Sequence, residues 1–246
     1  MDRIIYTSMT GARAAADRQA VLSHNLANAA TTGFRAEMHN FRSVPMQGEG
    51  ATTRVFALEA TSGHDSKSGP AQTTGRALDA MAVGGAWFSV QGLDGTEAYT
   101  RAGAFELTAT GQLVTPMGLA VLSDAGAPID VPPDAEVTLG GDGTLSVRQP
   151  GQQPQALARL KLVTPSAEAP IRRSDDGLFR GAGGAPLPAD ANAQLRSGML
   201  EGSNVNPVEA MVGMIAAARQ FEQQMRLLST AESDDKAAGR LLSLNG

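Results

Sequence analysis

The sequence has no cysteine, few aromatic residues (4%) and almost no lysine. Without cysteine the chain forms no disulfide, offers no thiolate to a metal and has no thiol nucleophile. The basic residues are nearly all arginines, and no basic run is longer than Arg172-Arg173. Because nucleic-acid binding needs a basic face and the formal net charge is −5, we expect no nucleic-acid partner.

Long apolar runs are also missing. Polar residues interrupt the opening Met1–Tyr6 at once, whereas a cleaved signal peptide needs a run of ~7–15 apolar residues. No stretch approaches the ~18 apolar residues of a membrane span. These features are compatible with a cytosolic protein, and equally with export by a route that does not read a cleaved signal.

Catalytic and metal-binding patterns are weak. His24, His39 and His64 are far apart in the sequence, and no nucleophile elbow or phosphate-binding loop is present. The sequences Asp142-Gly143 and Asp175-Asp176-Gly177 lack the alternating acidic residues of a calcium loop and favour hairpin turns. We therefore predict a structural protein with no cofactor, no metal and no small-molecule substrate, although an all-β enzyme with scattered loop carboxylates stays open as an alternative.

The N-terminal 30 residues predict a helix. They contain one glycine, no proline and many alanines, and Thr32-Gly33 marks the expected stop. Apolar or small residues recur at helical spacing along one stripe. The stripe consists of Ile5, Met9, Ala12 and Ala16, and continues through Gln19, Ser23 and Leu26. Such small side chains let another helix approach closely but bury little area.

The C-terminal end predicts a longer helix with a well-defined start. Asn206 is a suitable N-cap, Pro207 stands at the first helical position, and Glu209 falls where a capping box places an acidic residue. Steps of three and four residues then define an a/d seam. The seam consists of Met211, Met214, Ala218, Phe221, Met225 and Leu228. This helix could lie on its own domain, but a long helix at each end favours pairing of the two.

The middle of the chain differs from both ends. Residues 36–75 have few large apolar residues and predict an extended or irregular arm. From residue 76 onward, short apolar runs alternate with glycine-rich turns, which predicts a small β-rich domain. The expected strands cover residues 78–83, 86–90, 112–114, 119–122, 136–139, 145–147 and 157–163.

Together these patterns predict an α+β fold. The N- and C-terminal helices pair as a coiled-coil-like unit, and a central, mainly-β domain lies between them in sequence. The expected segments are a helix with its following motif (1–35), the arm (36–75), the β-rich domain (76–195) and the C-terminal motif with its helix (196–246).

Two segments resemble signatures of a known family. His24-Asn25-Leu26-Ala27-Asn28-Ala29-Ala30-Thr31-Thr32-Gly33-Phe34-Arg35 is similar to the N-terminal signature of the flagellar axial proteins, which form the rod and hook. His24 and Thr32 stand where that signature usually has Asn and Pro. A second segment is similar to the matching C-terminal signature of the same family. This segment is Leu200-Glu201-Gly202-Ser203-Asn204-Val205-Asn206-Pro207-Val208-Glu209-Ala210-Met211-Val212.

Within this family the chain most resembles the proximal-rod subunit of the basal body. The similarity extends through Gly75–Asp79, Glu97–Arg101, Val131–Ala135 and Asp175–Phe179. The resemblance implies a structural subunit that assembles with other rod subunits into the periplasmic drive shaft of a bacterial flagellum. It also implies export by the flagellar type III apparatus without a cleaved signal.

The resemblance implies that the assembly interface lies at the two ends of the chain. Beside the stripe and seam residues, we expect contributions from Asn25, Asn28, Gly33, Phe34, Asn204 and Asn206. The four asparagines are expected to satisfy backbone groups where helices meet turns, either across segments or as caps of their own helices. A distal-rod or hook-type subunit, or a secreted β-domain enzyme or adhesin, is the alternative.

Overall fold

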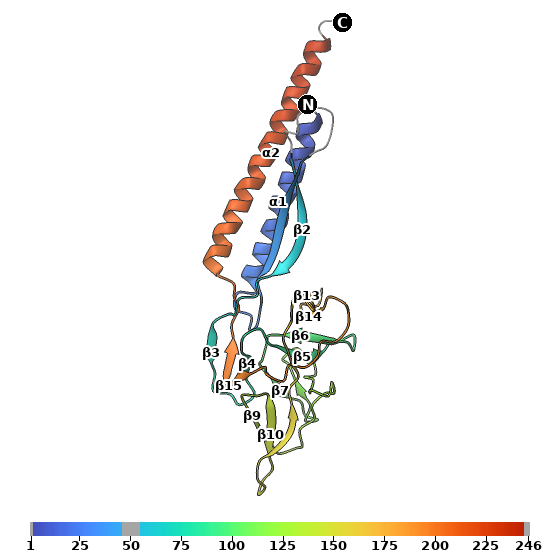
Figure 1. The fold of residues 1–246 in the computed structure, drawn as a ribbon. Coiled ribbons are helices and arrows are strands. Elements are labelled where there is room, and N and C mark those ends of the chain that lie inside the picture. The colour runs from blue at the N-terminus through green and yellow to red at the C-terminus, as the bar shows by residue number, and fades with distance from the viewer. Residues whose placement is uncertain (1, 46–54, 244–246) are drawn as a thin grey trace. The chain divides into compact units, whose positions relative to one another are not determined.

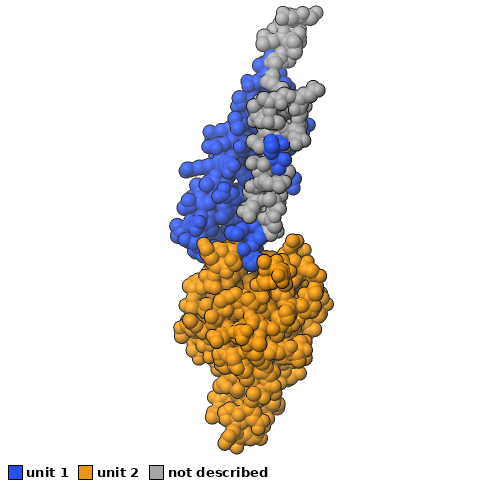
Figure 2. Space-filling model, viewed as in Figure 1, with its two compact units in different colours: residues 1–29, 37–64, 205–246 blue, residues 30–36, 65–204 orange. Residues whose placement is uncertain are grey.

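The computed structural model describes residues 2–45 and 55–243 (Figure 1). The chain divides into two compact units, which Figure 2 colours separately. Unit 1 contains residues 1–29, 37–64 and 205–246, and unit 2 contains residues 30–36 and 65–204. The combination of terminal helices with a central, mainly-β region confirms the predicted α+β class.

The first helix, α1, covers Asp2–Ala27. It ends where the side-chain amide of Asn28 donates a hydrogen bond to the carbonyl oxygen of His24 at 2.9 Å. This bond satisfies one of the carbonyl groups that the last helical turn leaves without a partner. The helix therefore stops a few residues before the predicted Thr32-Gly33 signal.

The second helix, α2, covers Pro207–Ser243. Its start is the predicted one, because Oδ1 of Asn206 accepts hydrogen bonds from the backbone N–H of Val208 (3.1 Å) and Glu209 (3.3 Å). Pro207 costs nothing at the first position, where an N–H would have no helical partner. Over their described residues, neither α1 nor α2 is apolar enough over a sufficient length to cross a membrane.

Within unit 1 the two helices lie side by side and run in opposite directions (Figure 1). A Cβ placed on Gly11 would lie 2.9 Å from Cδ of Gln224, and one on Gly213 would lie 3.0 Å from Cδ1 of Leu22. The lack of a side chain at both glycines therefore permits the close approach of the helices.

Unit 1 also contains a pair of antiparallel strands, β1 (Glu37–Pro45) and β2 (Val55–His64), which contact α1. Their register shifts by one residue between Asn40 and Phe41. Both strands belong to the segment 36–75, for which the sequence predicts an extended or irregular arm. Residues 46–54 of that arm lie outside the described residues, and the proposed division of the chain into four segments stays a prediction.

Unit 2 is built from short strands in antiparallel pairs. Its largest sheet has the order β12-β5-β6-β14-β13, a second has the order β11-β10-β9, and the remaining pairs are β15-β4, β16-β3 and β7-β8. The bounds are β3 (Ala71–Thr73), β4 (Ala80–Ala82), β5 (Trp87–Gln91), β6 (Glu97–Thr100), β7 (Glu106–Leu107), β8 (Leu113–Val114), β9 (Glu136–Leu139), β10 (Thr144–Arg148), β11 (Gln155–Arg159), β12 (Leu162–Val163), β13 (Ile171–Arg173), β14 (Phe179–Gly181), β15 (Leu195–Ser197) and β16 (Met199–Glu201).

The core of unit 2 collects the apolar residues of these strands into two clusters. In the larger one, the rings of Phe88 and Phe105 meet edge to face with centroids 5.1 Å apart. The smaller cluster holds Trp87 against Phe179 (4.6 Å) and encloses Tyr99. Burial raises the pKa of Tyr99 to about 12, and its oxygen accepts a hydrogen bond from the N–H of Leu187 at 2.6 Å.

Most predicted strands are present with small changes of boundary. The predicted strand 157–163 is two strands, because the chain leaves β10 after Arg159 and pairs next with β5. Residues 119–122 make only isolated bridges, including one between Val121 and Val90. Asp142-Gly143 forms the predicted turn between β9 and β10, with Gly143 at a φ of +87°.

We expect low pH to weaken the turn between β9 and β10 through protonation of the Asp142 carboxylate. Hydrogen bonds from the N–H and hydroxyl of Thr144 hold the pKa of Asp142 below its ordinary value. The folded state therefore favours the carboxylate. Its contribution to stability is present above the ordinary pKa of about 4 and is lost as the pH falls through the lower pKa of the folded protein.

We expect Asp142→Ala to destabilise the protein at pH 7, with a difference from the unmodified chain that shrinks as the pH falls below about 4. Urea unfolding at a series of pH values measures this. Asp142→Asn is the matched control, because it keeps an oxygen acceptor for Thr144 but does not titrate. A difference between Asp142→Ala and the unmodified chain that is constant with pH would contradict the prediction.

Candidate functional site

The end of the N-terminal signature is held tightly within unit 2. Gly33 has a φ of +70°, a conformation that favours glycine, and its N–H donates to the carbonyl oxygen of Glu201 at 2.7 Å. A Cβ on Gly33 would lie 2.3 Å from the backbone nitrogen of Ala102. Phe34 is buried, with the guanidinium of Arg173 4.6 Å from its ring centroid.

The carboxylate of Glu201, at the end of β16, is fully buried and receives charged donors on both oxygens. Oε1 forms an ion pair with Nη1 of Arg35 (2.8 Å) and accepts a hydrogen bond from the N–H of Gly69 (2.9 Å). Oε2 accepts a hydrogen bond from Nε of Arg101 (2.7 Å) and forms an ion pair with Nη2 of the same residue (2.5 Å). One side chain of the C-terminal signature thus binds the N-terminal signature, the segment before β3 and the residue after β6.

The second arginine of this cluster is as deeply buried as the carboxylate. Arg101 also donates to the carbonyl oxygens of Ala82 (3.0 Å), Gly84 (3.1 Å) and Ala86. Burial lowers the pKa of Arg101, and the charge of Glu201 opposes that shift. The ring of Trp87 has the guanidinium carbons of both Arg35 and Arg101 at 5.8 Å from its centroid.

These contacts leave two buried arginines sharing one carboxylate. Nε of Arg35 has no hydrogen-bond partner among the described residues. Removal of one member of a buried ion pair typically costs about 3–5 kcal/mol, because the remaining charge is left without compensation in a medium of low polarity. The cluster therefore depends strongly on Glu201.

Asn204 joins two of the same segments, the N-terminal signature and the residues before β3, through neutral hydrogen bonds. Its Oδ1 accepts from the N–H of Ala36 at 2.7 Å, and its Nδ2 donates to the carbonyl oxygens of Asp65 (3.0 Å) and Lys67 (2.9 Å). The N–H of Asn204 donates to the carbonyl oxygen of Phe34 at 3.3 Å. The sequence predicts a backbone-satisfying role for this asparagine, and in the structure it bonds to backbone groups of two other segments, residues 34–36 and 65–67.

Asn25 has a similar role in unit 1. Its side chain makes a two-way bond to the backbone of Glu37, with Nδ2 donating to the carbonyl oxygen (2.9 Å) and Oδ1 accepting from the N–H (2.8 Å). Nδ1 of the neighbouring His24 lies 3.0 Å from Oε2 of Glu37. Asn28 and Asn206, in contrast, bond to groups of their own helices.

The stripe of α1 that faces inward is shifted relative to the predicted one. Ser8 and Ala15 are buried, whereas the predicted Met9 is 57% exposed and Ala16 is exposed. Ala12 belongs to both stripes and is buried. The helix turns its smallest residues inward because small side chains allow a close approach.

The same shift occurs in α2. Ala210 and Ala217 are buried, whereas the predicted seam residues Met211 (51%) and Met225 (44%) are exposed. Phe221 is also exposed. Met211, Phe221 and Met225 of the predicted seam are therefore largely exposed in this chain, and their part in an assembly interface stays a prediction.

The remaining predicted residues fall into clear groups. The half-buried ones are Ile5, Leu26, Asn28, Asn204, Met214, Ala218 and Leu228. The further exposed ones are Asn206 and Pro207. The signature residues Gly33, Phe34 and Asn204 all belong to unit 2, so the structure brings them together with Glu201.

The sequence patterns predict no role for Arg35, Arg101 or Glu201. A usable signal was present, because Arg35 and Glu201 are each a charged residue inside a segment of small and apolar ones, Gly33-Phe34-Arg35 and Leu200-Glu201-Gly202. Charged residues are almost never fully buried unless they are paired. Their pairing partners lie 166 and 100 positions away, and sequence spacing does not reveal such distant pairs.

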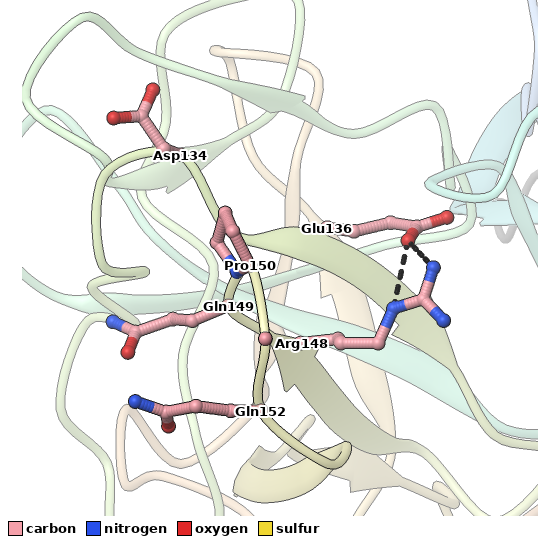
Figure 3. Close-up of a pocket in the computed structure, with 7 residues that line it drawn as sticks. Asp134, Glu136, Arg148, Gln149, Pro150 and Gln152 are labelled. Atoms are coloured by element: carbon pink, nitrogen blue, oxygen red, sulfur yellow. Dashed lines mark hydrogen bonds and ion pairs between the residues drawn. The ribbon is translucent and has the colours of Figure 1, made fainter.

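A polar hollow of about 310 Å³ lies beside β9 and β10 (Figure 3). Glu136 and Arg148, opposite each other on these strands, form an ion pair. The side chains of Gln149 and Gln152 point away from this pair. The hollow is lined by Asp134, Glu136, Arg148, Gln149, Pro150, Gly151 and Gln152. It contains no residue of either signature segment. Across the part of the chain that the structure describes, no group of three or more His, Asp and Glu side chains could hold a metal ion.

Comparisons with known proteins decide the family. The model described as "Flagella basal body rod protein" matches residues 5–35, "Flagellar hook protein FlgE/F/G D1 domain" matches 81–147, and "Flagellar basal body rod FlgEFG protein C-terminal" matches 196–241. The flagellar basal-body rod protein FlgF of Salmonella typhimurium is 43% identical to this chain over the full length of both, and that of Escherichia coli is 42% identical, also over both full lengths.

The chain belongs to the flagellar basal-body rod protein family. A rod protein FlgG, from Bacillus subtilis, is 31% identical over 94% of this chain and 96% of its own. Membership confirms the predicted resemblance and the prediction of a structural protein rather than an enzyme. Within this rod protein, both matched terminal regions contain a signature segment, and those segments meet at Glu201.

Gly33→Ala tests the close packing of the N-terminal signature. We expect a loss of about 3 kcal/mol in the free energy of unfolding, because the new methyl group clashes with the backbone and the residue is held at a positive φ. Gly75→Ala is the matched control, since Gly75 has a φ of +74° but an added Cβ would meet nothing within 4 Å.

The control should lose only about 1 kcal/mol. Urea unfolding of both variants measures the difference, which isolates the clash from the backbone strain. Equal losses in the two variants would show that the approach of Ala102 to Gly33 is unimportant.

Proposed function

We propose that this chain is a subunit of the proximal flagellar rod and assembles with other rod subunits into the shaft that transmits motor torque across the periplasm. It reaches that place through the flagellar type III export apparatus without a cleaved signal. The full-length similarity to rod proteins named FlgF supports this assignment over a distal-rod or hook-type subunit. Family membership leaves the secreted enzyme or adhesin with less support.

The observation that carries the proposal is the separation of small and large apolar residues on α2. Ala210 and Ala217 face inward, whereas the larger Met211, Val212 and Ile215 are exposed. Exposed apolar side chains in such a row are typical of protein interaction surfaces. The larger residues thus supply contacts to neighbouring subunits, and the terminal helices act as a coiled-coil-like unit within the rod.

The predicted interface residues fit this arrangement in two roles. Ile5, Ala12, Met214 and Leu228 contribute to the packing of the paired helices. Met9, Ala16, Phe221 and Met225 contribute to contacts between subunits. Torque is then shared among many shallow contacts around a tube, and the four predicted segments of the chain divide this work between helices, arm and β-rich domain.

The position in the rod is tested by locating the subunit within isolated basal bodies. Density or antibody label at the proximal part of the rod is the expected result. Label at the distal rod or in the hook would replace the proposal with one of its alternatives. Loss of motility in a deletion strain is expected for any rod or hook subunit. It is not expected for a secreted enzyme or adhesin.

Phe221→Asp should abolish swimming, because a charge on the exposed apolar face of α2 opposes burial between subunits. The free energy of unfolding of the purified protein should change by no more than about 0.5 kcal/mol, as for other surface substitutions. Gln220→Asp, at the adjacent exposed position, is the control and should leave swimming intact. Normal motility of the Phe221 variant would count heavily against the proposed interface.

Hydrogen exchange of the purified monomer tests whether assembly orders the ends of the chain. The inward stripes consist mainly of alanine and bury little apolar area, and isolated helices of this kind are marginal in water. We therefore expect fast exchange in residues 5–25 and 210–235 and slow exchange in β5 and β6. Strong protection of both helices in the monomer would refute folding on assembly.

A further inference from the structure

The fully buried carboxylate of Glu201 joins segments that are remote in sequence, and the proposed function does not require this. Its three partner residues, Arg35, Gly69 and Arg101, come from three segments that are remote in sequence: the N-terminal signature, the residues before β3 and the residue after β6. Among the carboxylates that the structure describes, only this one pairs with two buried arginines. Residues 30–36 are therefore fixed by a group that lies at the opposite end of the chain.

The backbone bonds of the N-terminal signature end on the same partner segment. The N–H of Gly33 donates to the carbonyl oxygen of Glu201, and the N–H of Ala36 donates to Oδ1 of Asn204. With Glu201 withdrawn, Arg35 and Arg101 would both lie near Trp87 without a counter-charge. Such an arrangement strongly disfavours burial.

We propose that Glu201 is a latch that couples the docking of the two signature segments, so that unit 2 holds residues 30–36 and 201–204 together or holds neither. Docking of residues 30–36 buries Arg35 and is favourable only when the carboxylate is in place. Docking of residues 201–204 buries Glu201 and is favourable only when Arg35 and Arg101 surround it. By thermodynamic linkage, the coupling has the same size in both directions.

The order of the chain gives this latch a direction. Arg35, Gly69 and Arg101 all precede Glu201, so a chain that is made from its N-terminus supplies the carboxylate last. Until then the two arginines stay hydrated and residues 30–36 stay undocked. The latch can therefore form only after the chain has been made as far as the C-terminal signature.

Hydrogen exchange on the full-length protein tests the coupling. In Glu201→Gln, exchange at the amides of Gly33 and Ala36 should accelerate by about a hundredfold, the result of leaving two arginines without compensation. Exchange at amides of the β9–β10 hairpin should change far less. Leu145→Ala is the matched control, because it removes a fully buried side chain of β10 and destabilises unit 2 without touching the latch.

The reciprocal variant decides the outcome if Glu201→Gln fails to fold. Arg35→Met keeps much of the side-chain volume and leaves the pair of Arg101 and Glu201 intact, yet it should accelerate exchange at Gly202, whose N–H bonds to the carbonyl oxygen of Pro70. Selective exposure of the opposite signature supports the latch. Exchange that rises equally throughout unit 2, as in Leu145→Ala, or that does not change at the opposite signature, would overturn it.

Discussion

The carboxylate of Glu201 is the point on which the middle of this protein depends. It is fully buried and it compensates two buried arginines. Its own segment supplies the backbone oxygen of Glu201 and the side-chain oxygen of Asn204, which accept hydrogen bonds from the N–H groups of Gly33 and Ala36. A buried charge is stable only with complete pairing, so the segments that supply the partners must all be in place. This requirement gives a physical reason for two signature segments at opposite ends of one chain.

The terminal helices follow a different rule. Their inward faces are built from alanine, serine and glycine, which permit close approach but bury little area. Several of their larger apolar side chains, including Met9, Met211 and Met225, stay exposed in the single chain. A subunit with such helices is suited to assembly, because the apolar area that remains exposed becomes useful only when neighbours cover it.

The rod protein therefore has one class of residues that docks its own segments and another that is available for contacts outside the chain. Polar and charged groups with strict geometry, such as Glu201 and Asn204, fix the backbone where the signatures dock in unit 2. Apolar groups with loose geometry, such as Met211 and Met225, are available for contacts outside the chain, and methionine adapts well to irregular surfaces. The two classes of interaction respond differently to mutation, since loss of the first exposes unpaired charge and loss of the second removes only area.

The sequence by itself determined the α+β class, both helices, the Asn206 cap and the turn at Asp142-Gly143, because these follow from local spacing and backbone preference. It also indicated the family from two motifs. It did not determine which side of each helix faces inward, since Ala15 and Ala16 differ only through the position of the partner helix. It did not reveal the pairing of Arg35 and Arg101 with Glu201 either. Only the tertiary structure decided these points, because burial and ion pairing depend on distances between segments that are remote in sequence.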